Sequence, residues 1–284
     1  SSIPMAADPA VVIAPDGALA PLACGPLTTL SNALLRVDVA AQAGGRIAQI
    51  HHRGVAQLLG PEDGNPATIA WGSFPMAPWA GRIRHGRFHF AGRDYRLPAN
   101  FGGHAIHGVA FALPWTVEQA TAEAATLVLA LPQDARWPFG GQVRQQLVLD
   151  GAVLHQRLEG TAGAQAMPVT LGWHPWFRKP HRLEFHPEAI YPRDADGIAV
   201  LPLAPPPPGP WDDCFVNRRP VVLHGDGMRL RLDSDCEHWV VFDELAHTTC
   251  VEPQSGPPDA PTLAPRILQP GETAQAWMRM EWLP

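Results

Sequence analysis

The chain has 284 residues, of which 46% are hydrophobic and 17% charged, and its formal net charge is −6. This apolar content suffices for a sizeable packed core and excludes disorder over most of the chain. The acidic balance and the lack of a basic run argue against nucleic acid or an anionic membrane surface as partner. We therefore expect a small ligand that is neutral or weakly charged.

The first part of the chain contains no clear element. Before Leu30 the sequence shows neither the basic start nor the apolar stretch of a signal peptide. An apolar run of about 18 residues, the length of a membrane-spanning helix, does not occur anywhere. We expect a cytoplasmic protein with a single domain over residues 1–284, in which residues 1–28 form an N-terminal extension or an edge segment.

Short segments of alternating polarity follow, separated by 26 glycines and 32 prolines that leave little room for long helices. Alternation with a period of two is typical of half-buried strands. It predicts strands at 35–39, 87–90, 142–149, 228–232 and 274–282, and the continuous apolar run 126–131 predicts an inner strand. Ala91-Gly92 and Asp150-Gly151 sit where tight hairpin turns are expected.

This succession of short strands and turns predicts an all-β fold, a large antiparallel β-sandwich. One biased tract interrupts it, with prolines at 202, 205–208 and 210. Proline-rich segments are stiff and extended. We expect a buried structural loop there rather than a docking site for a proline-recognising partner.

The cysteines and the single lysine exclude two kinds of chemistry. The four cysteines, at positions 24, 214, 236 and 250, have no CxxC spacing, and a chain of this size does not need disulfides, so buried free thiols are expected. Lys179 lies between Arg178 and Pro180, where an exposed side chain is expected. A Schiff base requires a desolvated amine, so lysine-imine catalysis is not expected.

Two remote segments offer an imidazole and a carboxylate for acid–base chemistry. His174 is flanked by aromatic residues that would restrict its rotamer and exclude water, and Trp176 beside it offers a face for a sugar ring. A histidine buried in an aromatic core is the alternative interpretation. Glu252 lies in a segment rich in Pro and Gly and is expected in a strand-end loop.

Further polar residues favour a binding site. His104 and His107 have the short spacing of metal ligands, and with His174 and Glu252 they would complete a metal site, although nothing in the sequence favours one and we expect neither metal nor cofactor. Arg82 could donate hydrogen bonds to sugar oxygens or pair with a carboxylate.

Asp212 and Asp213 follow Trp211, and one of them could accept hydrogen bonds from substrate hydroxyls while the other faces solvent or caps a turn.

These segments together resemble the aldose 1-epimerase (galactose mutarotase) family over roughly residues 30–284. The motifs, in chain order, are Arg82-Ile-x-x-Gly86-x-Phe88 running on to Asn100, His107-Gly108, Trp173-His174-Pro175-Trp176-Phe177, Asp212-Asp-Cys-Phe215, and Glu252-Pro-Gln254 with Pro258-Asp259-Ala260. The resemblance implies a galactose-mutarotase-like supersandwich. It also implies that the protein interconverts the α and β anomers of an aldose, without a cofactor.

The same resemblance implies a role for each site residue. Glu252 would be the general base and His174 the general acid, while His107, Asp212, Arg82 and Trp176 would bind the sugar. A free Glu titrates near about 4.3 and a free His near about 6.5. Ionised Glu252 and protonated His174 are therefore expected together at slightly acid pH, and their mutual attraction would widen that window.

Two departures from the family pattern leave the substrate open. Gly81 replaces an Asn before Arg82-Ile83, and Val109 stands where many members have a second glycine. Hydroxyl recognition depends on such groups.

Three alternatives remain at this point. The first is a hexose-6-phosphate epimerase, whose phosphate would be held by arginines drawn from positions 84, 87, 93 and 178. The second is a non-catalytic sugar-binding protein of the same fold. The third is a metal-dependent enzyme that uses His104, His107, His174 and Glu252.

Overall fold

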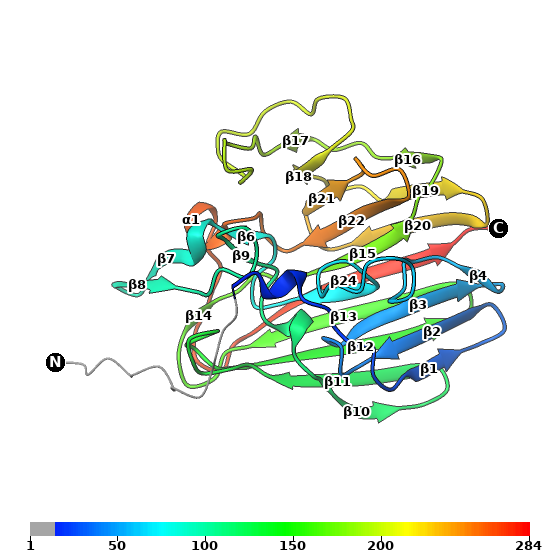
Figure 1. Cartoon of the computed structure of the whole chain (residues 1–284), viewed down its shortest axis with the longest axis horizontal. Coiled ribbons are helices and arrows are strands. Elements are labelled where there is room, and N and C mark those ends of the chain that lie inside the picture. The colour runs from blue at the N-terminus through cyan, green and yellow to red at the C-terminus, as the bar shows by residue number, and fades with distance from the viewer. Residues whose placement is uncertain (1–14) are drawn as a thin grey trace.

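The computed structural model describes residues 15–284, and two antiparallel sheets make up most of it (Figure 1). The expected extension or edge segment at residues 1–28 falls partly on residues 1–14, which lie outside the described residues. From residue 15 onward the chain forms a short 3₁₀ helix, η1 (Gly17–Leu19), before the first strand begins at Thr28.

The larger sheet has ten strands and carries the residues predicted to be catalytic. Its order is β1 (Thr28–Ser31), β2 (Leu35–Ala40), β3 (Arg46–His52), β5 (Ser73–Met76), β15 (Gly172–Arg178), β22 (Thr248–Gln254), β21 (His238–Phe242), β18 (Asp212–Val216) and β17 (Ala189–Ile190), with β4 (Val55–Ala56) paired to β3. Strands from the two ends of the chain therefore meet at the centre of this sheet, where β15 lies between β5 and β22.

The smaller sheet has eight strands and packs against the larger one (Figure 1). Its order is β10 (Thr116–Ala120), β11 (Ala124–Ala130), β12 (Gln142–Asp150), β13 (Val153–Thr161), β24 (Thr273–Trp282), β20 (Met228–Ser234), β19 (Val221–Gly225) and β16 (Arg182–Glu184). Most of its strands follow one another in the chain, so hairpins connect them.

Shorter elements complete the described part. Three two-stranded sheets pair β6 (Arg82–Ile83) with β9 (Ala105–Ile106), β7 (Arg87–Phe90) with β8 (Arg93–Arg96), and β14 (Met167–Pro168) with β23 (Ile267–Leu268). The helical pieces are η2 (Arg84–Gly86), η3 (Ala110–Ala112) and α1 (Ala260–Leu263). None of the helices in residues 15–284 is long and apolar enough to cross a bilayer.

The predicted all-β antiparallel sandwich is confirmed. The five alternating segments lie within β2, β7, β12, β20 and β24, and the apolar run at 126–131 lies mostly in β11, an inner strand between β10 and β12. At the first predicted turn Phe90 pairs with Arg93, and Ala91 and Gly92 between them both have positive φ, 49° and 75°. Two such residues form the type I′ turn whose twist matches that of the flanking strands.

Side chains along the central strands point alternately into the core and toward the candidate site. Trp173 and Phe177 on β15 and Val251 on β22 are fully buried in the core cluster between the sheets, where the Trp173 Nε1 donates to Gln145 Oε1 on β12 at 3.3 Å. Because successive side chains of a strand point to opposite faces, the residues between them face away from the second sheet. These are the residues that form the candidate site.

Two expectations about exposure are wrong. The proline-rich tract is largely exposed, with Leu201 at 52%. Prolines cannot donate to a ladder, and within this tract the Pro207 carbonyl accepts from the Trp211 Nε1 at 2.9 Å. Among the four free cysteines, Cys24 is only half-buried and the other three are buried, as expected. Lys179 is exposed, as expected, and its Nζ donates to the Asp243 carbonyl at 2.7 Å.

Candidate functional site

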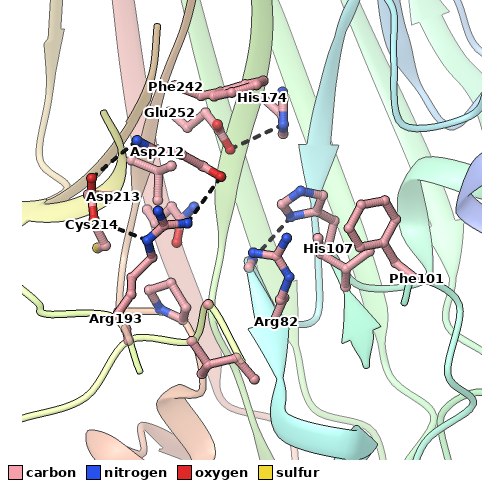
Figure 2. Close-up of a pocket in the computed structure, with 18 of the residues that line it drawn as sticks. Arg82, Phe101, His107, His174, Arg193, Asp212, Asp213, Cys214, Phe242 and Glu252 are labelled. Atoms are coloured by element: carbon pink, nitrogen blue, oxygen red, sulfur yellow. Dashed lines mark hydrogen bonds and ion pairs between the residues drawn. The ribbon is translucent and has the colours of Figure 1, made fainter. Parts of the chain in front are cut away.

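A pocket of about 220 Å³ opens on the outer face of the larger sheet (Figure 2). All six residues singled out from the sequence line it: Arg82, His107, His174, Trp176, Asp212 and Glu252. They come from β6, the turn after β9, β15, β18 and β22, so the fold gathers them from distant segments. The volume lies below the about 300–1,000 Å³ of sites for drug-sized ligands, which favours a ligand the size of one sugar ring.

Two prolines shape the sheet where the acid and the base lie. Strands β15 and β22 pair at Gly172–Gln254 and resume at Trp176–Cys250, a register that places His174 opposite Glu252. Pro175 and Pro253 fall in this interval and have no N–H to give to a ladder. Glu252 is therefore in the middle of a buried strand, and the expected strand-end loop is wrong.

His174 and Glu252 are in direct contact. The His174 Nε2 lies 3.4 Å from the Glu252 Oε1, and the two residues are only 5% and 2% exposed. Stacking holds the imidazole, since the centroids of the Phe74 and Trp176 rings lie 4.7 Å and 5.2 Å from its own and both rings are tilted by less than 30°. His174 Nδ1 and Glu252 Oε1 are buried without a hydrogen-bond partner in the described chain. Such unmet groups are what a polar substrate would satisfy.

Burial moves both groups toward their neutral forms. Desolvation raises the pKa of Glu252 well above its usual range, and the charge of Asp212 adds to this effect. Desolvation also lowers the pKa of His174 to about 3. When the pair holds one proton, burial therefore favours its place on Glu252. This reverses the expected ion pair of ionised Glu252 and protonated His174, because water exclusion outweighs their attraction.

His107 is fixed by the turn that presents it. Its φ is +60°, and its backbone N–H donates to the Gly81 carbonyl at 3.0 Å while its Nδ1 accepts from the Gly81 N–H at 3.1 Å. Because Nδ1 is an acceptor, the neutral ring carries its proton on Nε2. The ring meets that of His174 edge-on at 4.9 Å. His107 thus presents an N–H donor beside the acid–base pair.

Gly81 is required by its own surroundings. Its φ is +70°, and a Cβ there would lie 2.9 Å from the Cβ of Pro258. Gly92 has the similar φ of +75° with nothing within 4 Å of a built Cβ, so it is a matched control. We expect Gly81→Ala to lower the free energy of unfolding by about 1–3 kcal/mol more than Gly92→Ala, the usual cost of overpacking. Urea unfolding of the two variants measures this; equal losses would contradict a role for Pro258.

Arg82 and Asp212 face the pocket from opposite sides (Figure 2). The Arg82 guanidinium lies 5.4 Å from the Phe101 ring centroid, and no carboxylate of residues 15–284 forms an ion pair with it, so the structural pairing considered for Arg82 is absent there. On β18, Asp212 pairs with Phe242 and Cys214 with Val240, which is opposite Glu252. Asp212 therefore shares the face of Glu252, and burial raises the pKa of its carboxyl.

Four further polar or aromatic residues line the pocket and were given no role from the sequence: Phe101, Arg193, Phe242 and Gln254. Arg193 contacts Asp212 at 3.4 Å and Asp213 at 3.2 Å. Arg193 lies in an irregular segment, whose sequence has no alternation or motif that would indicate a binding residue. Gln254 was detectable, because it lies two residues after Glu252 on the same strand face. Its side chain is fully buried and neither amide atom has a partner in the described chain.

Three of the four residues considered as metal ligands lie close together, but the hydrogen bonds of His107 do not fit a metal site. Ligand atoms of His107, His174 and Glu252 lie within 4.8 Å of one another. His104 is elsewhere, since its Nδ1 accepts from the His85 N–H at 2.9 Å. Metal-bound histidines usually donate their second ring N–H to an acceptor, whereas His107 Nδ1 accepts a backbone N–H. The remaining His107 nitrogen thus carries a proton, and the arrangement does not favour a metal.

The phosphate alternative loses its candidate arginines. Within residues 15–284 none of the four lines the pocket; Arg84 pairs with Asp194 at 2.6 Å and Arg178 with Asp63 at 3.0 Å. The pocket itself holds two arginines, 82 and 193, against three carboxyl groups, 212, 213 and 252. This balance favours a neutral ligand over a phosphorylated one.

Comparison with known proteins identifies the class. The family model for aldose 1-epimerase matches residues 26–281. Two uncharacterized Escherichia coli K12 proteins are similar over part of the chain: YphB is 29% identical over 152 residues (52% of this chain and 51% of YphB), and YihR is 28% identical over 137 residues (47% and 44%). The matches thus span about half the length of these relatives. The chain belongs to the aldose 1-epimerase family.

Solved structures share the fold. A galactose mutarotase-like protein from Clostridium acetobutylicum has a TM-score of 0.80 at 15% identity, covering 90% of this chain and 95% of the other. A GalM/aldose epimerase homologue from C. elegans has a TM-score of 0.78 at 14% identity, covering 91% and 98%. The galactose 1-epimerase from Lactobacillus acidophilus has a TM-score of 0.74 at 18% identity, covering 90% and 93%.

Proposed function

We propose that the protein is an isomerase, an aldose 1-epimerase that interconverts the α and β anomers of a free, uncharged aldose. One observation supports this above all: a buried imidazole and a buried carboxyl group meet at 3.4 Å on the floor of a pocket the size of a sugar ring. The two oxygens that exchange protons in anomerisation share one carbon atom. An acid and a base this close can reach both at once.

Ring opening needs one proton removed and one supplied. The proton that burial favours on Glu252 first moves to His174 across their 3.4 Å contact, which leaves an ionised base and a protonated acid. Glu252 then takes the proton of the anomeric hydroxyl as the carbonyl forms, while His174 gives its proton to the ring oxygen as the C–O bond breaks. The aldehyde end then turns about its C–C bond, and the reverse transfers close the ring on the other face. Proton number and charge balance at each step, and each positioned transfer contributes on the order of 10²–10⁴-fold.

The shifted pKa values suit this cycle. Ring opening leaves Glu252 protonated and His174 neutral, which is the state that burial favours in the empty pocket. The water-free site therefore stabilises protonated Glu252 and neutral His174 while the open-chain sugar is bound. Once the ionised pair has formed, the raised basicity of Glu252 and the raised acidity of protonated His174 both favour ring opening.

The remaining residues would bind the sugar. Trp176, with Phe101 and Phe242, offers apolar faces for the C–H side of the ring. Arg82, the His107 Nε2–H and the unpartnered amide of Gln254 offer hydrogen-bond donors, and Asp212 offers an acceptor. Such groups decide between hydroxyl configurations, because an unmatched buried donor is costly.

The reaction should show a broad pH plateau. The pair is active with one proton, so kcat/KM falls as pH drops through the pKa of His174, about 3, and as pH rises through the raised pKa of Glu252. The rate should therefore hold as pH drops from 6.5 to 4.5, because the lowered pKa of His174 keeps the pair from binding a second proton in that range. Polarimetry from pH 4.5 to 9 measures this; a tenfold fall in kcat/KM between pH 6.5 and 4.5 would contradict it.

Polarimetry also tests the proposed function itself. The protein should speed the change in optical rotation of freshly dissolved α-glucose or α-galactose, before and after dialysis against EDTA. A rate equal to that in buffer, with sugar binding still detectable, would favour the non-catalytic alternative. Activity confined to hexose 6-phosphates, or lost with the chelator, would favour the other two alternatives instead.

A further inference from the structure

A buried cation lies behind the acid–base pair. Arg46 on β3 is 0% exposed, and among residues 15–284 no carboxylate forms an ion pair with it. Its guanidinium is held by backbone carbonyls: Nε donates to Ala43 at 2.6 Å, Nη1 to Thr68 at 2.8 Å and Trp71 at 3.0 Å, and Nη2 to Phe111 at 2.7 Å. Carbonyl dipoles satisfy the donors, but they leave the unit charge uncompensated.

This cation is stacked in line with the imidazole. The Arg46 Cζ lies 4.4 Å from the Trp71 ring and 4.9 Å from the Phe74 ring. Phe74 is in turn stacked on His174 at 4.7 Å, and the two residues are direct partners in the β5–β15 ladder. One aromatic ring therefore separates the guanidinium from the imidazole, with no space for screening water.

Burying an unpaired charge is costly even when backbone carbonyls accept from all its donor groups. Burial lowers the pKa of Arg46 to about 9, so the group stays charged at neutral pH. A fixed positive charge in a water-poor region opposes a second positive charge nearby. Its influence on His174 acts in the same direction as desolvation, lowering the imidazole pKa.

Other charged and titratable groups surround the pair. Glu252 on β22 contacts His174, His107 meets it edge-on, and Arg82 and Asp212 line the same pocket. On the far side, Arg46 influences the half-buried Cys24. Arg46 differs from all of these because it lies behind the stacked rings and does not line the pocket.

We propose that Arg46 is a positioning residue for the acid–base pair: acting through Phe74, its uncompensated charge keeps His174 neutral in the empty pocket and makes the imidazolium formed during turnover a stronger acid. This inference rests on the proposed function for its catalytic part. Its electrostatic part concerns the empty protein and can be measured without a sugar.

The test is an NMR titration of ¹⁵N-labelled histidine in the sugar-free protein, with His174 assigned by its loss in His174→Asn. In the wild type, His174 should stay neutral down to at least about pH 5. In Arg46→Met it should bind a proton on the order of tenfold more tightly, the effect of one charge acting across a water-free layer about 10 Å thick. Arg46→Lys keeps the charge and should titrate like the wild type.

Controls separate charge from damage. Arg36→Met removes an exposed arginine of the neighbouring strand β2 and should leave the His174 titration unchanged. By polarimetry, Arg46→Met should change kcat at pH 7 more than KM, because the charge acts on the acid–base pair and not on the sugar contacts. Protonation of wild-type His174 near pH 6.5, an unshifted titration in folded Arg46→Met, or equal shifts in the Met and Lys variants would each overturn the proposal. If Arg46→Met does not fold, Arg46→Gln, which removes the charge but keeps an N–H donor for the carbonyls, takes its place and should show the same shift. Absence of epimerase activity in the wild type would instead count against the proposed function alone.

Discussion

Glu252→Gln should abolish catalysed anomerisation and make the protein more stable. Gln has the shape of the protonated carboxyl but cannot accept the proton of the anomeric hydroxyl. We expect kcat/KM to fall by on the order of 10²–10⁴-fold, the contribution of one positioned proton transfer. Polarimetry with the purified variant measures the loss, and a variant that keeps more than a tenth of the wild-type rate would contradict the assigned role.

The gain in stability follows from the raised pKa of Glu252. The unfolded chain ionises this group above about pH 4.5, whereas the folded protein retains the proton, so folding becomes less favourable as pH rises until the folded-state pKa is passed. Gln carries no such cost. We expect Glu252→Gln to gain about 1–2 kcal/mol near pH 8, with the gain shrinking toward pH 4.

The control for this variant is Glu244→Gln, which removes an exposed carboxyl away from the pocket. It should change neither the rate of anomerisation nor the unfolding midpoint. Thermal unfolding at pH 5 and pH 8 makes the comparison. A destabilised Glu252→Gln at pH 8 would show that Glu252 is ionised in the folded protein, contrary to the buried environment described above.

His174→Asn should cost as much activity as Glu252→Gln, and the double variant should lose hardly more than either single one. Acid and base act in one step, so removing the first leaves the second without a function, and such losses do not add. Each single variant is expected to lose on the order of 10²–10⁴-fold. The four rates of this double-mutant cycle are measured under one set of conditions.

Exposed His155 on β13 provides the matched control, because His155→Asn removes an imidazole remote from the pocket. It should retain the wild-type rate. If instead the losses in His174→Asn and Glu252→Gln multiply in the double variant, the two side chains act in separate steps. The contact at 3.4 Å would then not be the reacting pair.

Local patterns predicted the fold well. Strict alternation in segments such as 142–149 and 274–282 fixes which face of each strand is buried, and tight turns such as Ala91-Gly92 fix the pairing of neighbours. Such patterns cannot predict that β15 lies between β5 and β22, because that order depends on contacts between segments far apart in the chain.

The sequence predicted six residues that line one pocket, but not the environment in which they lie. Motif order identified His174 and Glu252, yet the Pro-rich flank of Glu252 suggested a loop, whereas Pro253 occupies a gap in a central ladder. Desolvation depends on everything packed around a group, so the expectation of an ion pair failed. Arg46 and Arg193 were not singled out, because neither the burial of one nor the ion pairs of the other has a local sequence signal.

Two-dimensional exchange NMR at equilibrium tests the central claim most directly, because it follows the anomeric protons of a sugar without any net reaction. With the wild-type protein and glucose or galactose, cross-peaks should connect the α and β anomeric signals. With Glu252→Gln or His174→Asn at the same concentration, they should fall to the level of buffer. Wild-type cross-peaks no stronger than those in buffer for every free aldose tried, or full exchange in either variant, would contradict the account.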